Sequence, residues 1–245
     1  MAHKTYVNEV SGANTAVLFI HGFLGSTEHF DRFLAKLDGY VSVFNILLAG
    51  HGGTVLDFAN VSMEAWKQQA AQEAERICKK YENVYIVAHS MGTFFAMEAA
   101  IQHPDTVKGI ILLQTPLKIG VKPSAAINTF KSFFNIFGED EISRAYKTAH
   151  SVTLNYKIWE YLGWIPRYLE LFSESKRARE TICRLNVPCI IFQARNDELV
   201  SMKSLKYIPG KDNITVHVLE NSAHFMFAIE DEKDMTEAIL NMIKQ

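Results

Sequence analysis

Short runs of apolar and β-branched residues alternate along this chain with longer amphipathic stretches, and this alternation limits the fold more than any other feature. The short runs predict strands at Thr15–Ile20, Val41–Leu47, Val84–Val87, Gly109–Leu113, Cys189–Phe192 and Thr215–Leu219. The amphipathic stretches predict helices at Thr27–Leu37, Met63–Tyr81, Met91–Gln102, Ser201–Tyr207 and Asp231–Ile243. Strands separated by helices are typical of a parallel sheet flanked by helices. The predicted fold class is therefore α/β.

The alternation is interrupted after the fourth predicted strand, and the fifth begins only much later. The segment 116–184 instead predicts several short helices, because Ser124 can cap one of them and Pro166 can open another. Eleven of the chain's 28 aromatic residues lie in this segment. We therefore expect a core formed by residues 1–115 and 185–245, with 116–184 inserted as an apolar helical cap, or lid.

A serine follows the third predicted strand, in the segment Ala88–Gly92 (Ala-His-Ser-Met-Gly). A strand, a sharp turn and a helix present the nucleophilic serine in Gly-x-Ser-x-Gly enzymes. Small residues are needed on both sides because the turn brings the helix close to neighbouring strands, and Ala88 in place of glycine adds one methyl group. A lone serine before a helix is more often only a cap. Ser90 is therefore a candidate nucleophile whose role depends on its context.

A glycine-rich turn after the first predicted strand supplies that context. The strand is followed by the segment His21–Ser26 (His-Gly-Phe-Leu-Gly-Ser), which exposes backbone N–H groups. In a hydrolase the N–H groups of Phe23 and Met91 would hold the oxyanion, each contributing roughly 3 kcal/mol to the transition state. The alternative is a simple strand-to-helix turn. The presence of Ser90 favours the oxyanion hole.

Together with Gly50-His51-Gly52, these segments resemble the α/β-hydrolase superfamily over nearly the whole chain. Two further segments, Gln193–Glu198 (Gln-Ala-Arg-Asn-Asp-Glu) and Ser222–His224 (Ser-Ala-His), are most similar to small bacterial carboxylesterases and monoacylglycerol lipases. The resemblance implies an α/β-hydrolase fold with a mostly parallel sheet. It also implies a catalytic triad in the chain order serine, acid, histidine.

The candidate acid is Asp197, which lies just beyond the fifth predicted strand. Ligands gather at the C-terminal ends of the strands in open parallel sheets. Asp197 could instead cap the helix at Ser201, and Glu198 is the fallback acid. The other position used in this superfamily, after the fourth strand, offers Gln114 and Thr115, and neither side chain ionises. This strengthens the assignment of Asp197.

The candidate base is His224, chosen from nine histidines by position. Position argues against those inside a strand, at the end of a helix or in glycine turns, namely His217, His103, His21 and His51. His224 lies on the loop between the last strand and the last helix, where its imidazole can reach between Ser90 and Asp197.

Four phenylalanines recur at i, i+3, i+4 and i+7 and predict an apolar stripe on one cap helix, at Phe130, Phe133, Phe134 and Phe137. The stripe is either cap core or the roof of an acyl pocket above Ser90. Membrane contact is a less favoured third interpretation, because the polar face has no run of lysines. The expected substrate-binding residues are Leu24, Phe130, Phe134, Phe137 and Phe225.

Charge and composition argue against several other classes. The net charge of −2 gives no electrostatic attraction to nucleic acid. The longest apolar run, near Ala16–Ile20, is far shorter than the roughly 20 residues of a membrane helix, and Met1–Glu9 lacks signal-peptide features. Three cysteines without zinc spacing predict free, buried thiols in a reducing compartment. We expect a cytoplasmic protein without metal or nucleotide cofactor and without stable membrane insertion.

The expected function is a serine esterase acting on a small-molecule carboxylic ester with an apolar acyl chain, through an acyl-enzyme on Ser90. One alternative is a carbon-carbon bond hydrolase or related lyase with the same triad. Such enzymes usually bind carboxylates, so a cap arginine in the pocket, such as Arg144 or Arg167, would favour that alternative. A second alternative is a non-catalytic small-molecule binding protein, since fold does not determine function.

Overall fold

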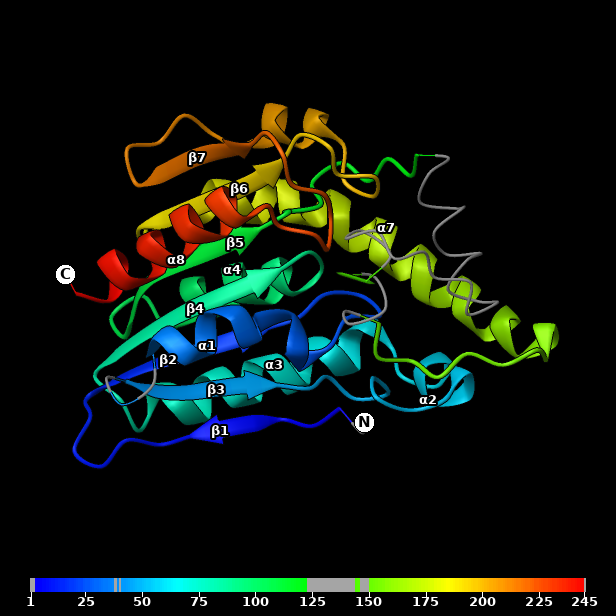
Figure 1. Cartoon of the computed structure of the whole chain (residues 1–245), viewed down its shortest axis with the longest axis horizontal. Helices are drawn as coiled ribbons and strands as arrows, with labels where there is room; N and C mark the ends of the chain where they lie inside the picture. The colour runs from blue at the N-terminus through cyan, green and yellow to red at the C-terminus, as the bar shows by residue number, and fades with distance from the viewer. Residues whose placement is uncertain (1–2, 38, 40, 123–143, 146–149, 245) are drawn as a thin grey trace.

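A seven-stranded, mostly parallel sheet forms the centre of the computed structural model (Figure 1), which describes residues 3–37, 39, 41–122, 144–145 and 150–244. The strand order is β1-β3-β2-β4-β5-β6-β7, and only β1 is antiparallel to its neighbour. The strands are β1 Tyr6–Asn8, β2 Thr15–Ile20, β3 Ser42–Ile46, β4 Asn83–His89, β5 Val107–Leu113, β6 Cys189–Ala194 and β7 Ile214–Leu219.

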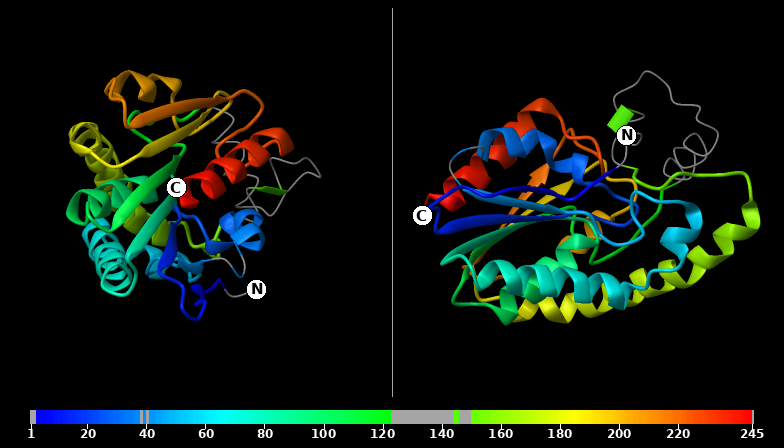
Figure 2. Two further views of the ribbon diagram at one scale, coloured as in Figure 1. Left: turned by 90° about the vertical axis from the view of Figure 1, so that its left-hand side faces the viewer. Right: turned by 90° about the horizontal axis from the view of Figure 1, so that it is seen from below.

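Helices cover both faces of the sheet (Figure 2). Helices α1 and α8 lie on one face, and α3, α4 and α7 lie on the other. The α-helices are α1 Asp31–Leu37, α2 Val55–Ala59, α3 Met63–Cys78, α4 Gly92–Gln102, α7 Trp164–Thr181 and α8 Ile229–Ile243. The 3₁₀ helices are η1 Thr27–Phe30, η2 Ile158–Gly163, η3 Ile182–Arg184 and η4 Met202–Tyr207.

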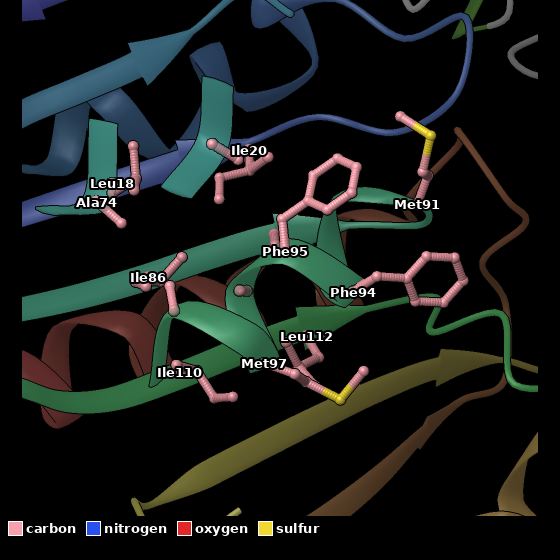
Figure 3. Close-up of a cluster of buried hydrophobic side chains, with 14 of the residues drawn as sticks. Leu18, Ile20, Ala74, Ile86, Met91, Phe94, Phe95, Met97, Ile110 and Leu112 are labelled. Carbon is pink, nitrogen blue, oxygen red and sulfur yellow. The ribbon is translucent and has the colours of Figure 1, made fainter. Parts of the chain in front are cut away.

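Each central strand is buried on both faces. In β2, Val17 and Phe19 pack toward α1 and α8, whereas Leu18 and Ile20 pack toward α3 and α4. This two-residue alternation places consecutive side chains in different cores. Figure 3 shows the second core, in which Phe94, Phe95 and Met97 of α4 lie over side chains of the central strands. Burial on both faces explains why these strands are continuous apolar runs in the sequence.

The predicted α/β class and all six predicted strands are confirmed, with boundary differences of one or two residues. The sequence patterns missed β1 and α2. Strand β1 has only three residues, and Tyr6 and Val7 are exposed at the sheet edge, so it lacks an apolar run. Helix α2 has five residues and depends on the capping box between Thr54 and Asp57 rather than on periodicity.

The five helices predicted outside segment 116–184 are also present, with changes in their bounds. The predicted helix Thr27–Leu37 is divided into η1 and α1, and the predicted helix at Ser201–Tyr207 is the 3₁₀ helix η4. Pro166 lies in the first turn of α7, which begins at Trp164. The missing proline N–H costs nothing there, because the first N–H groups of a helix have no intrahelical partner.

The segment 116–184, predicted to be a cap, contains η2, α7 and η3 in its described part. At its N-terminal end α7 lies beside α2, where the Trp164 indole N–H donates to the Val55 carbonyl oxygen over 2.9 Å. Farther along, Lys67 of α3 forms ion pairs with Glu174 of α7 and Glu98 of α4. Helix α7 therefore contacts α2 near its N-terminal end and α3 and α4 farther along. The predicted helix from Ser124 to Gly138 lies outside the described residues, and the division into core and cap stays a prediction.

All three cysteines are free thiols, as expected. Cys189 of β6 is buried, and burial raises the pKa of its thiol to about 12. Cys78 is half-buried. The expectation that all three are buried is wrong for Cys183, which is exposed in the short helix η3, where only Ile182 is buried.

Candidate active site

Ser90 occupies a strained turn between β4 and α4. Its φ angle is +52°, a left-handed conformation that is uncommon for residues with a side chain. The Ser90 N–H donates to the Leu113 carbonyl oxygen of β5 over 2.8 Å. The turn therefore places Ser90 at the C-terminal ends of β4 and β5.

Two glycines make room for this turn. A Cβ atom on Gly92 would lie 2.3 Å from the Ile20 carbonyl oxygen and 2.6 Å from the His21 carbonyl oxygen. A Cβ atom on Gly22 would lie 2.7 Å from the Ser90 Cβ. The expected close approach of α4 to a neighbouring strand is therefore present.

Replacing Gly92 by alanine is expected to destabilise the protein by roughly 1 to 3 kcal/mol, because the added methyl group meets backbone atoms that cannot move independently. Urea denaturation of the Gly92→Ala variant measures the loss. Gly210→Ala is the matched control, since no atom lies within 4 Å of its added Cβ. Equal stability of the two variants would contradict the close approach.

Asp197 and His224 form a buried, directed pair. The Asp197 Oδ2 lies 2.8 Å from the His224 Nδ1. The other carboxylate oxygen, Oδ1, accepts the N–H groups of Leu199 and Val200 over 2.8 and 2.7 Å. Because Oδ1 is held by two amides, Oδ2 is oriented toward the imidazole. Helix η4 is capped by the side chain of Ser201 itself, so Asp197 is not needed as its cap.

The charge around His224 favours its protonated form. Burial by itself would lower the pKa of His224, but the Asp197 charge, its hydrogen bond and the Glu198 charge together raise the pKa above its ordinary value. The carboxylate of Glu198, the fallback acid, accepts the backbone N–H of His224 over 3.2 Å. The Asp197 carboxylate is the one hydrogen-bonded to the ring nitrogen Nδ1.

The four histidines set aside in the sequence occupy the positions expected for them. His217 lies in β7, stacked on Phe192, and His103 ends α4. The His21 Nε2 accepts the Leu48 N–H over 3.0 Å, and burial lowers the pKa of His21 to about 4. His51 packs edge-on against His21.

The candidate oxyanion donors lie on the turns that follow β2 and β4. Phe23 is held by its ring, which packs against Phe58, Trp66 and Tyr168. Met91 is buried and directly follows Ser90. Among the described residues, neither the Phe23 N–H nor the Met91 N–H has a hydrogen-bond acceptor. Both amides are therefore available to a bound ligand.

An apolar cavity of about 440 Å³ adjoins Ser90 and His224. Leu24 and Phe225, both predicted to bind substrate, line it. The predicted residues Phe130, Phe134 and Phe137 lie outside the described residues. The other described apolar lining residues are Phe23, Pro116, Ile119, Val121, Leu154, Ile158, Tyr161, Trp164, Ile165, Tyr168, Leu171, Phe172, Leu199 and Val200.

Helix α7 contributes an apolar face to the cavity, which sequence reasoning did not assign. The face is made by Trp164, Ile165, Tyr168, Leu171 and Phe172. Their spacing of i, i+1, i+4, i+7 and i+8 is the helical period used above for the phenylalanine stripe. The same periodicity could have predicted an apolar face on α7 from the sequence. His150 also lines the cavity, and burial lowers its pKa to about 4, but no sequence pattern marks a lone histidine.

Neither arginine singled out in the sequence lines the cavity. Arg167 donates to the Ala59 carbonyl oxygen and to the Glu170 carboxylate, and Arg144 is exposed. Across the described ranges, no cluster of histidine, cysteine, aspartate or glutamate side chains could hold a metal ion. No helix among those ranges is long and apolar enough to cross a membrane.

Comparison with known proteins identifies the family of the chain. The family model described as the alpha/beta hydrolase fold matches residues 15–174, which is more than half of the chain. The chain therefore belongs to the alpha/beta hydrolase family. A curated relative from Arabidopsis thaliana, "Probable lysophospholipase BODYGUARD 2", is 27% identical over 122 residues, or 46% of this chain and 26% of the relative. The chain spans about a quarter of the length of the curated relatives it matches.

Solved structures share the fold over almost the whole chain. The structure reported for the metagenome-derived lipolytic enzymes LipS and LipT has a TM-score of 0.77 and 22% identity, and the match covers 99% of this chain and 98% of that one. The monoacylglycerol lipase of Paleococcus ferrophilus has a TM-score of 0.69 and 16% identity, with 100% and 99% covered. At these identities the likeness concerns the fold alone.

Proposed function

We propose that this protein is a serine hydrolase that cleaves carboxylic esters with an apolar acyl chain. The observation that carries the proposal is that Ser90 and His224 line one apolar cavity, with the buried Asp197 hydrogen-bonded to the His224 ring. A nucleophile, a base oriented by an acid, and a space for an acyl chain are the requirements for ester cleavage through an acyl-enzyme.

The mechanism follows from the role that each group can perform. Ser90 Oγ attacks the ester carbonyl carbon while the His224 Nε2 removes its proton. The N–H groups of Phe23 and Met91 stabilise the oxyanion that forms. His224 then returns the proton to the leaving alcohol, and water repeats the sequence to release the acid. Asp197 keeps the His224 Nδ1 protonated and stabilises the imidazolium.

The names of the similar proteins support an ester substrate. They include a probable lysophospholipase, lipolytic enzymes and a monoacylglycerol lipase. These names fit the apolar lining of the cavity. A small ester is accordingly the proposed partner, and the cytoplasmic location stays a prediction from the sequence.

The alternatives receive less support. A carbon-carbon bond hydrolase would need a cation for a carboxylate, and the described residues lining the cavity include no lysine or arginine. A non-catalytic binding protein would not need the buried carboxylate that orients His224.

The proposal is tested by assaying p-nitrophenyl esters from acetate to decanoate beside labelling by a fluorophosphonate, which reacts with activated serines. Hydrolysis together with labelling is the expected result. Labelling without ester hydrolysis would indicate a serine hydrolase of another class. The absence of both would overturn the proposal and favour the binding protein.

Truncating the cavity face of α7 is expected to shift preference toward longer acyl chains. The variants Leu171→Ala and Phe172→Ala each open space, and each further buried methylene is worth about 0.8 kcal/mol, or about fourfold in kcat/KM. The ratio of kcat/KM for octanoate over butyrate esters should therefore rise severalfold.

Leu169→Ala is the matched control for these variants, because Leu169 lies on the same helix but is 63% exposed and does not line the cavity. Its ratio should equal that of the unmodified protein. Equal ratios in all three variants would contradict an acyl-binding role of α7.

A further inference from the structure

The main chain of His224 is held from two sides. Its N–H donates to the Glu198 Oε2 over 3.2 Å, and its carbonyl oxygen lies 2.9 Å from the His89 Nε2. Glu198 and His89 are both almost completely buried. Both hydrogen bonds therefore lie in a region of low dielectric constant, where such bonds are strong and the loss of one partner is costly.

Each of these two partners is the neighbour in sequence of a candidate triad residue. His89 directly precedes Ser90, and Glu198 directly follows Asp197. Within the loop that carries His224, Ala223 N–H donates to the Met226 carbonyl oxygen and Ser222 donates to Asp231 at the start of α8. Those bonds shape the loop and attach it to α8. The bonds to His89 and Glu198 attach it directly to the end of β4 and to the turn after β6.

We propose that His89 and Glu198 are positioning residues that clamp the backbone of His224 between the turn bearing Ser90 and the turn bearing Asp197. This proposal rests on the proposed function. Because Glu198 holds the N–H of the peptide before the His224 Cα and His89 holds the carbonyl oxygen of the peptide after it, the clamp sets the position of the imidazole relative to nucleophile and acid. A displacement of about 1 Å in such a site reduces turnover strongly.

The chemistry of His89 suits this role. A carbonyl oxygen only accepts hydrogen bonds, so the His89 Nε2 must carry the proton. Burial, followed by the proximity of His29 and His224, lowers the pKa of His89 well below its ordinary value. His89 is therefore a neutral donor, and it does not repel the imidazolium that forms on His224 during turnover.

Glu198 adds a charge to the clamp. In the part of the chain that the structure describes, the titratable and aromatic groups around His224 are Asp197 and Glu198 from the turn after β6, His89 from β4, His29 from η1 and the ring of Phe225. The two histidines are neutral, because burial lowers their pKa values well below the ordinary value. Glu198 is thus the second negative charge beside His224, and its removal should make His224 easier to deprotonate.

The variant Glu198→Gln tests this consequence. Glutamine keeps an oxygen that accepts the His224 N–H and loses the charge. We expect the pKa of His224, followed by NMR of the ¹⁵N-labelled imidazole and assigned with His224→Ala, to fall, because the Glu198 charge is one of the causes that raise it. The acidic limb of kcat/KM should move to lower pH by the same amount, since the base must be neutral. The matched control Glu220→Gln removes an exposed charge paired with Arg195 and should shift neither value.

An unchanged His224 pKa in Glu198→Gln, or an equal shift in Glu220→Gln, would overturn the electrostatic role of Glu198 in the clamp. Because the NMR titration needs no turnover, it gives this answer even if the unmodified protein hydrolyses no ester. In that case the ester proposal fails separately.

Two substitutions at His89 test the donor. In His89→Gln the amide nitrogen can occupy the place of Nε2, so kcat should stay within about threefold of the unmodified value. His89→Phe removes the donor, and kcat should fall roughly tenfold or more with KM unchanged, because the ring does not line the cavity. An unchanged kcat in His89→Phe, or equal losses in both variants, would overturn the clamp. Thermal unfolding of each variant separates loss of turnover from loss of fold.

Discussion

The variant Ser90→Ala is expected to lose ester hydrolysis by at least about a thousandfold, together with all fluorophosphonate labelling. Both half-reactions of the proposed mechanism pass through the Ser90 hydroxyl, so the proposed acyl-enzyme cannot form without it. The residual rate would come from the oxyanion donors and from substrate binding. The fold should persist, because alanine fits the space of serine at the same φ of +52°. Turnover, labelling and thermal unfolding measure the three parts of this expectation.

The matched control for this change is Ser151→Ala. Ser151 is also buried, and it contacts the Leu24 carbonyl oxygen close to the turn after β2, but it does not line the cavity. Its removal should leave fluorophosphonate labelling intact. If Ser90→Ala were still labelled, the nucleophile would have to be another residue.

The variant Asp197→Asn is expected to reduce kcat/KM by roughly ten-thousandfold, the loss that this change produces in serine protease triads. The structure supplies the reason. Two backbone N–H groups, from Leu199 and Val200, require an acceptor at the Oδ1 position, so the asparagine oxygen must occupy it. The amide NH₂ then faces the His224 Nδ1 and donates to it. His224 would hold its proton on Nε2, where it cannot accept one from Ser90.

The melting temperature of Asp197→Asn should change little, because the two bonds at Oδ1 are kept. Measurement of kcat/KM on the best ester, beside thermal unfolding, checks both statements. Full activity would contradict the role of Asp197. If Glu198→Gln caused the ten-thousandfold loss and Asp197→Asn did not, Glu198 would be the acid.

The sheet could be predicted because each central strand is buried on both faces. Apolar runs such as Thr15–Ile20 have no other stable environment in a chain of this composition. Elements held by a few local bonds could not be predicted in the same way. Strand β1 depends on its antiparallel pairing with β3, and α2 depends on the Thr54–Asp57 capping box.

The candidate triad was also accessible from the sequence. Ser90, Asp197 and His224 each follow a predicted strand, and parallel strands end at one edge of a sheet. Chain order and the resemblance to α/β-hydrolases supported the same three residues. Their roles await the experiments above, but their gathering at that edge follows from topology.

Contacts between distant segments were decided only by the tertiary structure. Two apolar stripes, at Phe130–Phe137 and along α7, have similar periodicity, and periodicity describes a helix face without stating what that face contacts. Among the described residues, it is the apolar face of α7 that lines the cavity beside Ser90. The hydrogen bond from His89 to the His224 carbonyl oxygen joins positions 135 residues apart. Such a bond depends on how two loops meet in space, so no local pattern in the sequence encodes it.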